Sequence, residues 1–313
     1  MARSGGRPLL AGISIAVAAI ACLGTFAGVA SAATGGAPTA AGSPPPPGSP
    51  TGSPASGAPS AGTLSLVSAQ ATPRKSFYYG FRYPRLSFSI SSTQAQNDLR
   101  IDVVDAAGAS VRTFFRNDVA PDTETRIRWD GTTNDGRPAP NGRYSFQVSS
   151  QAGALAARSA TSSEATSLSF ALYGYAFPVL GTHDFGSSGA GFGAGRSGHS
   201  HQGQDVMAEC GLPMVAARGG RVQYSGYQGA AGNYVVIDGK GTTLDFMYAH
   251  LEQPSPLEAG DLVRTGQPIG IVGETGNAQG CHLHFEIWTA PGWYEGGSPI
   301  DPLPYLLRWD RYS

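Results

Sequence analysis

Apolar residues alternate with polar ones in short runs after residue 63, and this period-two pattern constrains the fold more than any other feature. It is typical of β-strands, whose successive side chains point to opposite faces. Glycine, proline, asparagine and aspartate separate the runs and predict turns. Three such runs are RLSFSIS (Leu86, Phe88, Ile90), LRIDVVD (Leu99, Ile101, Val103) and RYSFQVS (Tyr144, Phe146, Val148). We therefore predict an all-β chain.

The first 62 residues differ from the rest in composition. Residues 1–32 combine a basic start, a long apolar run and a small-residue cleavage site at Ala30–Ala32, which predicts a signal peptide. The alternatives are an uncleaved membrane anchor and lipidation at Cys22. Residues 33–62 contain only Ala, Thr, Gly, Pro and Ser, which predicts a disordered linker. We expect an exported protein.

Two folded domains are expected after the linker. Residues 63–172 hold the alternating runs and predict an immunoglobulin-like β-sandwich. Residues 173–313 are dense in glycine, hold all six histidines and predict a second β domain, with a short helix near DPLPYLLRWD. The formal net charge is −1. That balance excludes nucleic acid as an expected partner, because no basic field exists to attract it. We expect a monomer.

The segment HLHFEIW places potential metal ligands on one face of a strand. His282, His284 and Glu286 share that face, and the apolar residues between and after them should belong to the core. A His-x-His pair alone fits a structural role as well as a metal site. The segment HQGQD adds His201 and Asp205 across a glycine-containing bend.

Zinc binds nitrogen from histidine and oxygen from aspartate, and three protein ligands leave one tetrahedral position open for catalysis. His201, Asp205 and one histidine of HLHFEIW complete such a set. His250, in MYAHL, is then either a core histidine or a group that assists hydrolysis.

The segments HQGQD, YAHL, GDLVRTGQPIGIVGETGNAQGCHLHFEIW and PIDPLPYL occur in the order found in the lysostaphin-type zinc metallopeptidases, which residues 177–307 resemble. The resemblance implies a two-sheet antiparallel β fold with a central groove. It also implies cleavage of cross-bridges or stem peptides in bacterial peptidoglycan.

By this resemblance, one Zn²⁺ per chain is held by His201, Asp205 and His284, and His250 and His282 form the catalytic pair. His199 is expected to be a loop residue at the mouth of the cleft. Many members of the family carry a histidine where this chain has Gly239, which bears on substrate preference rather than on activity.

Other functions were weighed against a peptidase. Some relatives lack ligands and only activate other wall enzymes, but all five expected site positions are filled here. A biotinyl- or lipoyl-type carrier would need a lysine at a hairpin tip in an attachment context, which Lys240 lacks. Residues 129–148 resemble the immunoglobulin-like repeat of flagellar-hook capping proteins. The Asp-rich loop in that segment either binds calcium or, more simply, forms turns.

Two cysteines remain after the predicted cleavage, Cys210 and Cys281. Cys210 follows Asp205 by five residues, and Cys281 precedes His284 by three. One metal bound by both ligands would bring the two sulfurs together. Because thiols oxidise after export, we predict a disulfide between them. Two free, buried cysteines are the alternative.

Overall fold

The computed structural model describes residues 64–150, 153–154 and 168–313. The predicted signal peptide and linker, residues 1–62, lie outside the described residues. Within the described part of the chain, no helix is both long and apolar enough to span a membrane.

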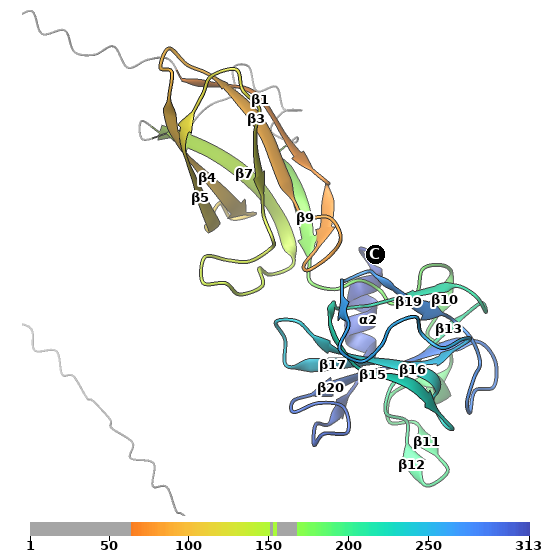
Figure 1. Cartoon of the computed structure of the whole chain (residues 1–313). Coiled ribbons are helices and arrows are strands. Elements are labelled where there is room, and N and C mark those ends of the chain that lie inside the picture. Colours follow the sequence, from red (N-terminus) through yellow and green to blue (C-terminus); the bar gives the residue numbers. More distant parts are fainter. Residues whose placement is uncertain (1–63, 151–152, 155–167) are drawn as a thin grey trace, which may run out of the picture. The chain divides into compact units, whose positions relative to one another are not determined.

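The described residues between 65 and 173 form two facing sheets, called the sandwich below (Figure 1). One sheet has the strand order β1-β3-β6, and the other β2-β9-β7-β4-β5, with β8 paired to β7. Neighbouring strands are antiparallel except for β2 and β9. The strands are β1 (Ser65–Thr72), β2 (Lys75–Phe77), β3 (Arg85–Ser91), β4 (Asn97–Asp105), β5 (Ser110–Val119), β6 (Thr125–Arg128), β7 (Gly142–Ser150), β8 (Gly153–Ala154) and β9 (Ser169–Tyr173).

The core of the sandwich follows the alternation in the sequence. Leu86, Phe88 and Ile90 of β3 are at most 1% exposed, and the residues between them are partly exposed. The predicted apolar faces of β4 and β7 are buried in the same cluster. The side chains of the two sheets therefore bury one shared apolar core.

Residues 183–300 form a larger antiparallel sheet with the order β10-β13-β20-β17-β16-β15-β18, and β21 pairs with β20 (Figure 1). Two-stranded sheets of β11 with β12 and β14 with β19 accompany it. The elements are β10 (His183–Asp184), a 3-10 turn (Ser188–Ala190), β11 (Gly195–Arg196), β12 (His199–Ser200), β13 (Gln204–Ala208), β14 (Pro213–Val215), β15 (Gly220–Gln228), β16 (Gly232–Gly239), β17 (Leu244–Leu251), β18 (Leu262–Val263), β19 (Pro268–Ile271), β20 (His282–Thr289), β21 (Pro299–Ile300) and α2 (Leu303–Asp310). The all-β prediction is confirmed.

Strand β20 carries the expected division between core and site. Leu283, Phe285 and Ile287 are fully buried on one face. Trp309 of α2 packs against that face, with its ring centroid 6.0 Å from that of Phe285. The helix predicted near DPLPYLLRWD is therefore present and closes the core beneath β20. The opposite face of the strand holds His282, His284 and Glu286.

Candidate metal centre and catalytic pocket

Strands β13 and β20 bring the expected metal ligands together. They are adjacent and antiparallel, with Asp205 directly opposite His284. His201 reaches the same point from the loop before β13. Gly203 lets this loop pass close over β20, because a Cβ there would lie 2.4 Å from the Phe285 carbonyl oxygen and 2.9 Å from the His284 ring. Only glycine fits this close approach.

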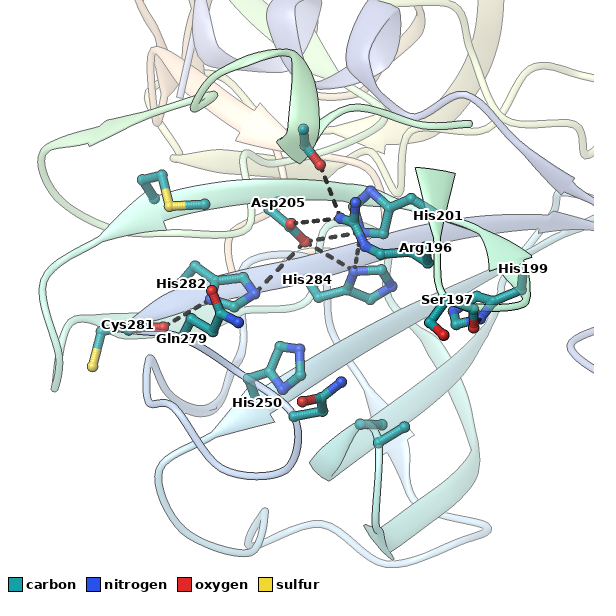
Figure 2. A pocket seen from close by; sticks show the side chains of 16 residues that line it. Arg196, Ser197, His199, His201, Asp205, His250, Gln279, Cys281, His282 and His284 are labelled. Atoms are coloured by element: carbon teal, nitrogen blue, oxygen red, sulfur yellow. Dashed lines mark hydrogen bonds and ion pairs between the residues drawn. The ribbon is translucent and has the colours of Figure 1, made fainter. Parts of the chain in front are cut away.

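Three ligand atoms form a compact triangle in this site (Figure 2). His201 Nε2 lies 2.8 Å from His284 Nδ1 and 3.1 Å from Asp205 Oδ1, and the last two atoms are 3.0 Å apart. Ligands at ~2.0–2.2 Å from zinc in a tetrahedron lie about 3.3–3.5 Å from each other. The triangle therefore fits one face of a zinc tetrahedron after small adjustments. Two imidazole nitrogens and one carboxylate oxygen are also the donor set of a catalytic zinc.

Outer hydrogen bonds fix the orientation of both ligand rings. His201 Nδ1 lies 2.9 Å from the Gly191 carbonyl oxygen, so it donates there and leaves Nε2 facing the centre. His284 Nε2 lies 2.9 Å from Glu286 Oε1, which turns Nδ1 toward the centre. Such partners orient metal ligands and raise their basicity.

Glu286 is a residue whose role the sequence did not predict. It is 6% exposed, and its Oε2 accepts hydrogen bonds from the indole N–H groups of Trp288 at 2.7 Å and Trp293 at 3.1 Å. A buried carboxylate needs such partners to stay charged. The period-two pattern placed Glu286 on the same strand face as His284, which was the available signal.

The Asp205 carboxylate and the His284 imidazole in the centre stabilise each other's charge. Burial opposes ionisation of Asp205, but hydrogen bonds from His201 and His284 outweigh it and hold the pKa of this carboxyl far below its usual value. Burial also opposes protonation of His284, yet its bonds to Asp205 and Glu286 raise the pKa of this imidazole to about 9. The site is therefore organised around negative charge, which suits a divalent cation.

His282 and His250 stand beside the triangle rather than in it (Figure 2). His282 Nε2 is 3.6 Å from Asp205 Oδ1, and the rings of His250 and His282 have centroids 4.6 Å apart. Each ring has Nδ1 close to a backbone carbonyl oxygen, at 2.9 Å from Gly280 for His282 and 2.7 Å from Thr275 for His250. Both Nε2 atoms are left without a backbone partner and available for proton transfer.

The backbone at His250 is unusual. Its φ of 62° is in the left-handed region, which costs a non-glycine residue on the order of 1–3 kcal/mol. Burial lowers the pKa of His250 to about 4, so the ring is neutral at physiological pH. Strained, buried histidines of this kind are concentrated at functional sites.

A pocket of about 660 Å³ lies at this site. The three triangle residues, the two neighbouring histidines and the β11–β12 hairpin all contribute to its lining. His199 was expected in a loop at the mouth of the cleft but lies on the two-residue strand β12, where it is exposed and lines this pocket. Arg196, on β11, was missed by the sequence analysis. Its Nη2 donates to the Gly189 carbonyl oxygen at 2.9 Å and lies 3.6 Å from Asp205 Oδ2. Arg196 thus approaches the Asp205 oxygen that lies outside the triangle.

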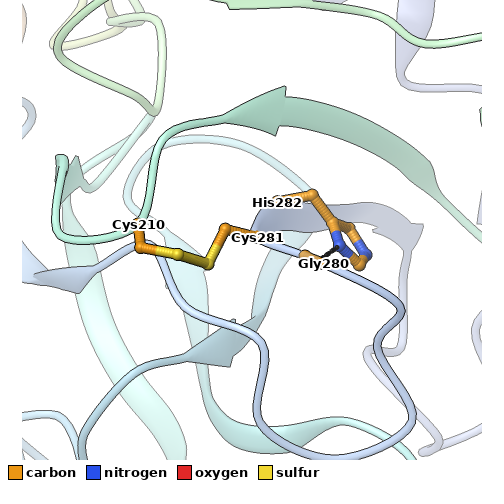
Figure 3. The surroundings of a disulfide bond; sticks show 4 residues. All are labelled: Cys210, Gly280, Cys281 and His282. Atoms are coloured by element: carbon orange, nitrogen blue, oxygen red, sulfur yellow. Dashed lines mark hydrogen bonds between the residues drawn. A yellow bond between two sulfur atoms is a disulfide. The ribbon is translucent and has the colours of Figure 1, made fainter.

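Cys210 and Cys281 form a disulfide (Figure 3). The two Cα atoms are 5.2 Å apart. The predicted bridge is therefore confirmed. It links the segment after β13 to the start of β20, next to His282.

Two family models match this chain. Residues 199–302 match peptidase family M23, and residues 84–154 match the FlgD Ig-like domain. The first match contains every residue of the triangle and both neighbouring histidines.

Known proteins are similar to part of this chain. Peptidoglycan DD-endopeptidase ShyC of Vibrio cholerae is 40% identical over 88 residues, which are 28% of this chain and 20% of that protein. DD-carboxypeptidase/endopeptidase Mpg of Neisseria meningitidis is 36% identical over 107 residues, 34% of this chain and 23% of that protein. The chain thus spans about a fifth of the length of these relatives. The solved catalytic domain of lysostaphin from Staphylococcus simulans is 30% identical, with 37% of this chain and 89% of that domain covered and a TM-score of 0.34.

Proposed function

We propose that this chain, whose residues 199–302 match peptidase family M23 and whose residues 84–154 match the FlgD Ig-like domain, is a zinc metalloendopeptidase acting on bacterial peptidoglycan. The triangle of His201, Asp205 and His284 carries the proposal, because its donor set and spacing suit a zinc with an open position. When bound, zinc supplies Lewis acid chemistry and makes water more acidic.

The proposed substrate is a peptide bond of a stem peptide or cross-bridge in peptidoglycan. A relative named as a peptidoglycan DD-endopeptidase supports this substrate class. A predicted signal peptide, residues 1–32, would deliver the protein to the compartment where the substrate lies. We also propose the domain boundary near residue 172 and a monomeric, secreted or wall-associated enzyme.

His250 and His282 would move protons during hydrolysis. His250 is neutral, so its Nε2 can accept a proton from the attacking water. His282 in its imidazolium form, with Nδ1–H donating to the Gly280 carbonyl oxygen, can donate a second hydrogen bond from Nε2–H to the oxyanion that forms at the scissile carbonyl. Gly280 and Thr275 position the two rings and take no part in proton transfer.

Asp205 offers the most direct test of the metal assignment. Asp205→Ala should lose zinc on dialysis, because the two remaining imidazole ligands lack the negatively charged third ligand. Zinc per chain can be measured by atomic absorption, with His199→Ala as the matched control, which should retain about one zinc. Stoichiometric zinc in dialysed Asp205→Ala would exclude this ligand set.

A non-catalytic regulator that binds wall and activates another hydrolase is the second candidate. The chain keeps every position of the expected site, which favours the enzyme. Zinc binding without hydrolysis of purified peptidoglycan would favour the regulator.

A further inference from the structure

Three arginines of the sandwich gather at one pocket, far along the sequence from the metal triangle. Arg82, Arg85 and Arg128 line this pocket together with Thr72, Pro73, Phe81 and Tyr83 of the sandwich and with Arg264, which lies outside the sandwich. Arg85 begins β3 and Arg128 ends β6, and the two are directly opposite each other in the antiparallel register. We call Arg82, Arg85 and Arg128 the arginine cluster.

The arginine cluster lacks the carboxylate partners that other arginines of the sandwich have. Ion pairs join Arg100 to Asp102 at 2.7 Å, Arg126 to Glu124 at 2.6 Å and Arg137 to Asp135 at 2.9 Å. No member of the cluster has an ion pair with any residue that the structure describes.

Like charges directly opposite on neighbouring strands destabilise a sheet. Arg85 and Arg128 therefore carry a cost that no ion pair with a carboxylate of the described residues offsets. A bound anion would offset it.

An aromatic ring holds one of the three guanidinium groups in place for a ligand. The Arg128 guanidinium carbon lies 4.5 Å from the centroid of the Tyr83 ring, a cation–π distance that restrains the side chain. Phe81 is 61% exposed and adds an apolar wall to the pocket. Planar guanidinium groups match carboxylate and phosphate oxygens in a bidentate manner.

We propose that the arginine cluster binds the repeated oxyanion groups of a wall polymer and thereby holds the protein on the wall. The anions are carboxylates of stem peptides or phosphates of a phosphate-bearing polymer, which present the same chemistry to arginine. The choice of a wall polymer rests on the proposed function, whereas the anion site itself does not. The arginine cluster belongs to the sandwich, and no residue that lines this pocket belongs to the metal triangle, so this binding requires no hydrolysis.

Sedimentation with insoluble or bead-linked polymer tests the proposal on the full chain. All proteins carry Asp205→Ala so that the substrate stays intact. The two probes are purified peptidoglycan stripped of phosphate polymers and bead-linked polyphosphate. The triple variant Arg82→Ala, Arg85→Ala, Arg128→Ala should bind at least one probe about tenfold or more weakly, because each lost contact is a charged hydrogen bond. Added salt should weaken binding by the protein with the intact cluster.

The matched control is Arg126→Ala, which removes an exposed arginine of the same strand that already has a partner, and its binding should be unchanged. If the triple variant loses binding to peptidoglycan alone, the ligands are carboxylates. If it loses binding to polyphosphate alone, the ligands are phosphates, and loss of binding to both probes supports a general oxyanion site. Equal binding by the triple variant on both probes, or an equal loss in Arg126→Ala, would overturn the proposal.

A single substitution keeps the proposal testable if the triple variant does not fold. Arg85→Gln should melt no lower than the parent protein, because it removes the opposed like charge, and should still bind several-fold more weakly. A stable Arg85→Gln protein with unchanged affinity for both probes would also count against the cluster.

Discussion

At the scale of single residues, Glu286 supports the candidate site by holding the ring of a metal ligand from outside the triangle. It contacts His284 and two tryptophans, and it belongs to no ligand set. Glu286→Gln keeps the shape but removes the charge that raises the basicity of His284. We predict a zinc affinity about 10–100-fold weaker, as for other outer partners of metal-bound histidines.

Competition with a coloured chelator measures this affinity. Glu295→Gln is the matched control, since that carboxylate bonds to the Tyr224 hydroxyl and to no ligand. An unchanged affinity in Glu286→Gln would mean that the ring of His284 is held by the metal alone.

His250 and His282 should separate catalysis from metal binding. Replacing either with alanine should lower the hydrolytic rate by roughly 10²–10⁴-fold, the range for a positioned acid–base or oxyanion group. Zinc content should stay near one per chain, because neither ring belongs to the triangle. A His282→Ala protein without zinc would show that the two histidines of HLHFEIW had been interchanged in our assignment.

At the scale of elements, strand β20 shows what the sequence could and could not predict. Alternation alone placed Leu283, Phe285 and Ile287 in the core and the two histidines on the other face. It could not reveal that Asp205 lies opposite His284, because register between strands 80 residues apart depends on tertiary packing. The family resemblance implied only that both residues bind the same metal.

Contacts that depend on loop conformation also could not be predicted from the sequence. The approach of Arg196 to Asp205 comes from the β11–β12 hairpin, whose two-residue strands carry no usable periodicity. The close passage at Gly203 likewise depends on backbone positions in another strand.

The disulfide is expected to stabilise the connection between β13 and β20. It closes a loop with a sequence separation of 71 residues. In the chain-entropy model, removing it with Cys210→Ser and Cys281→Ser lowers the free energy of unfolding by up to about 4 kcal/mol. Urea unfolding measures the change, and thiol titration of the denatured, unreduced protein starting at residue 33 should find no free thiol. Two reactive thiols per chain would contradict the bridge.

At the scale of the whole molecule, the candidate chemistry is confined to the C-terminal part of the chain. The triangle, both neighbouring histidines and Arg196 all follow residue 190 in the sequence. A fragment of residues 174–313 should therefore hydrolyse a small soluble stem peptide at a rate within a few-fold of the full chain. Circular dichroism should first establish that the fragment is folded. A folded but inactive fragment would show that the sandwich contributes to the active site.

The measurement that tests the central claim most directly is mass spectrometry of purified peptidoglycan after digestion. Protein starting at residue 33 should release fragments with newly cleaved peptide bonds, lose this activity to a chelator and regain it with added zinc. Asp205→Ala should release none of these fragments. Absence of cleavage by the zinc-loaded protein, or the same fragments from Asp205→Ala, would contradict the assignment of this chain as a zinc-dependent peptidoglycan peptidase.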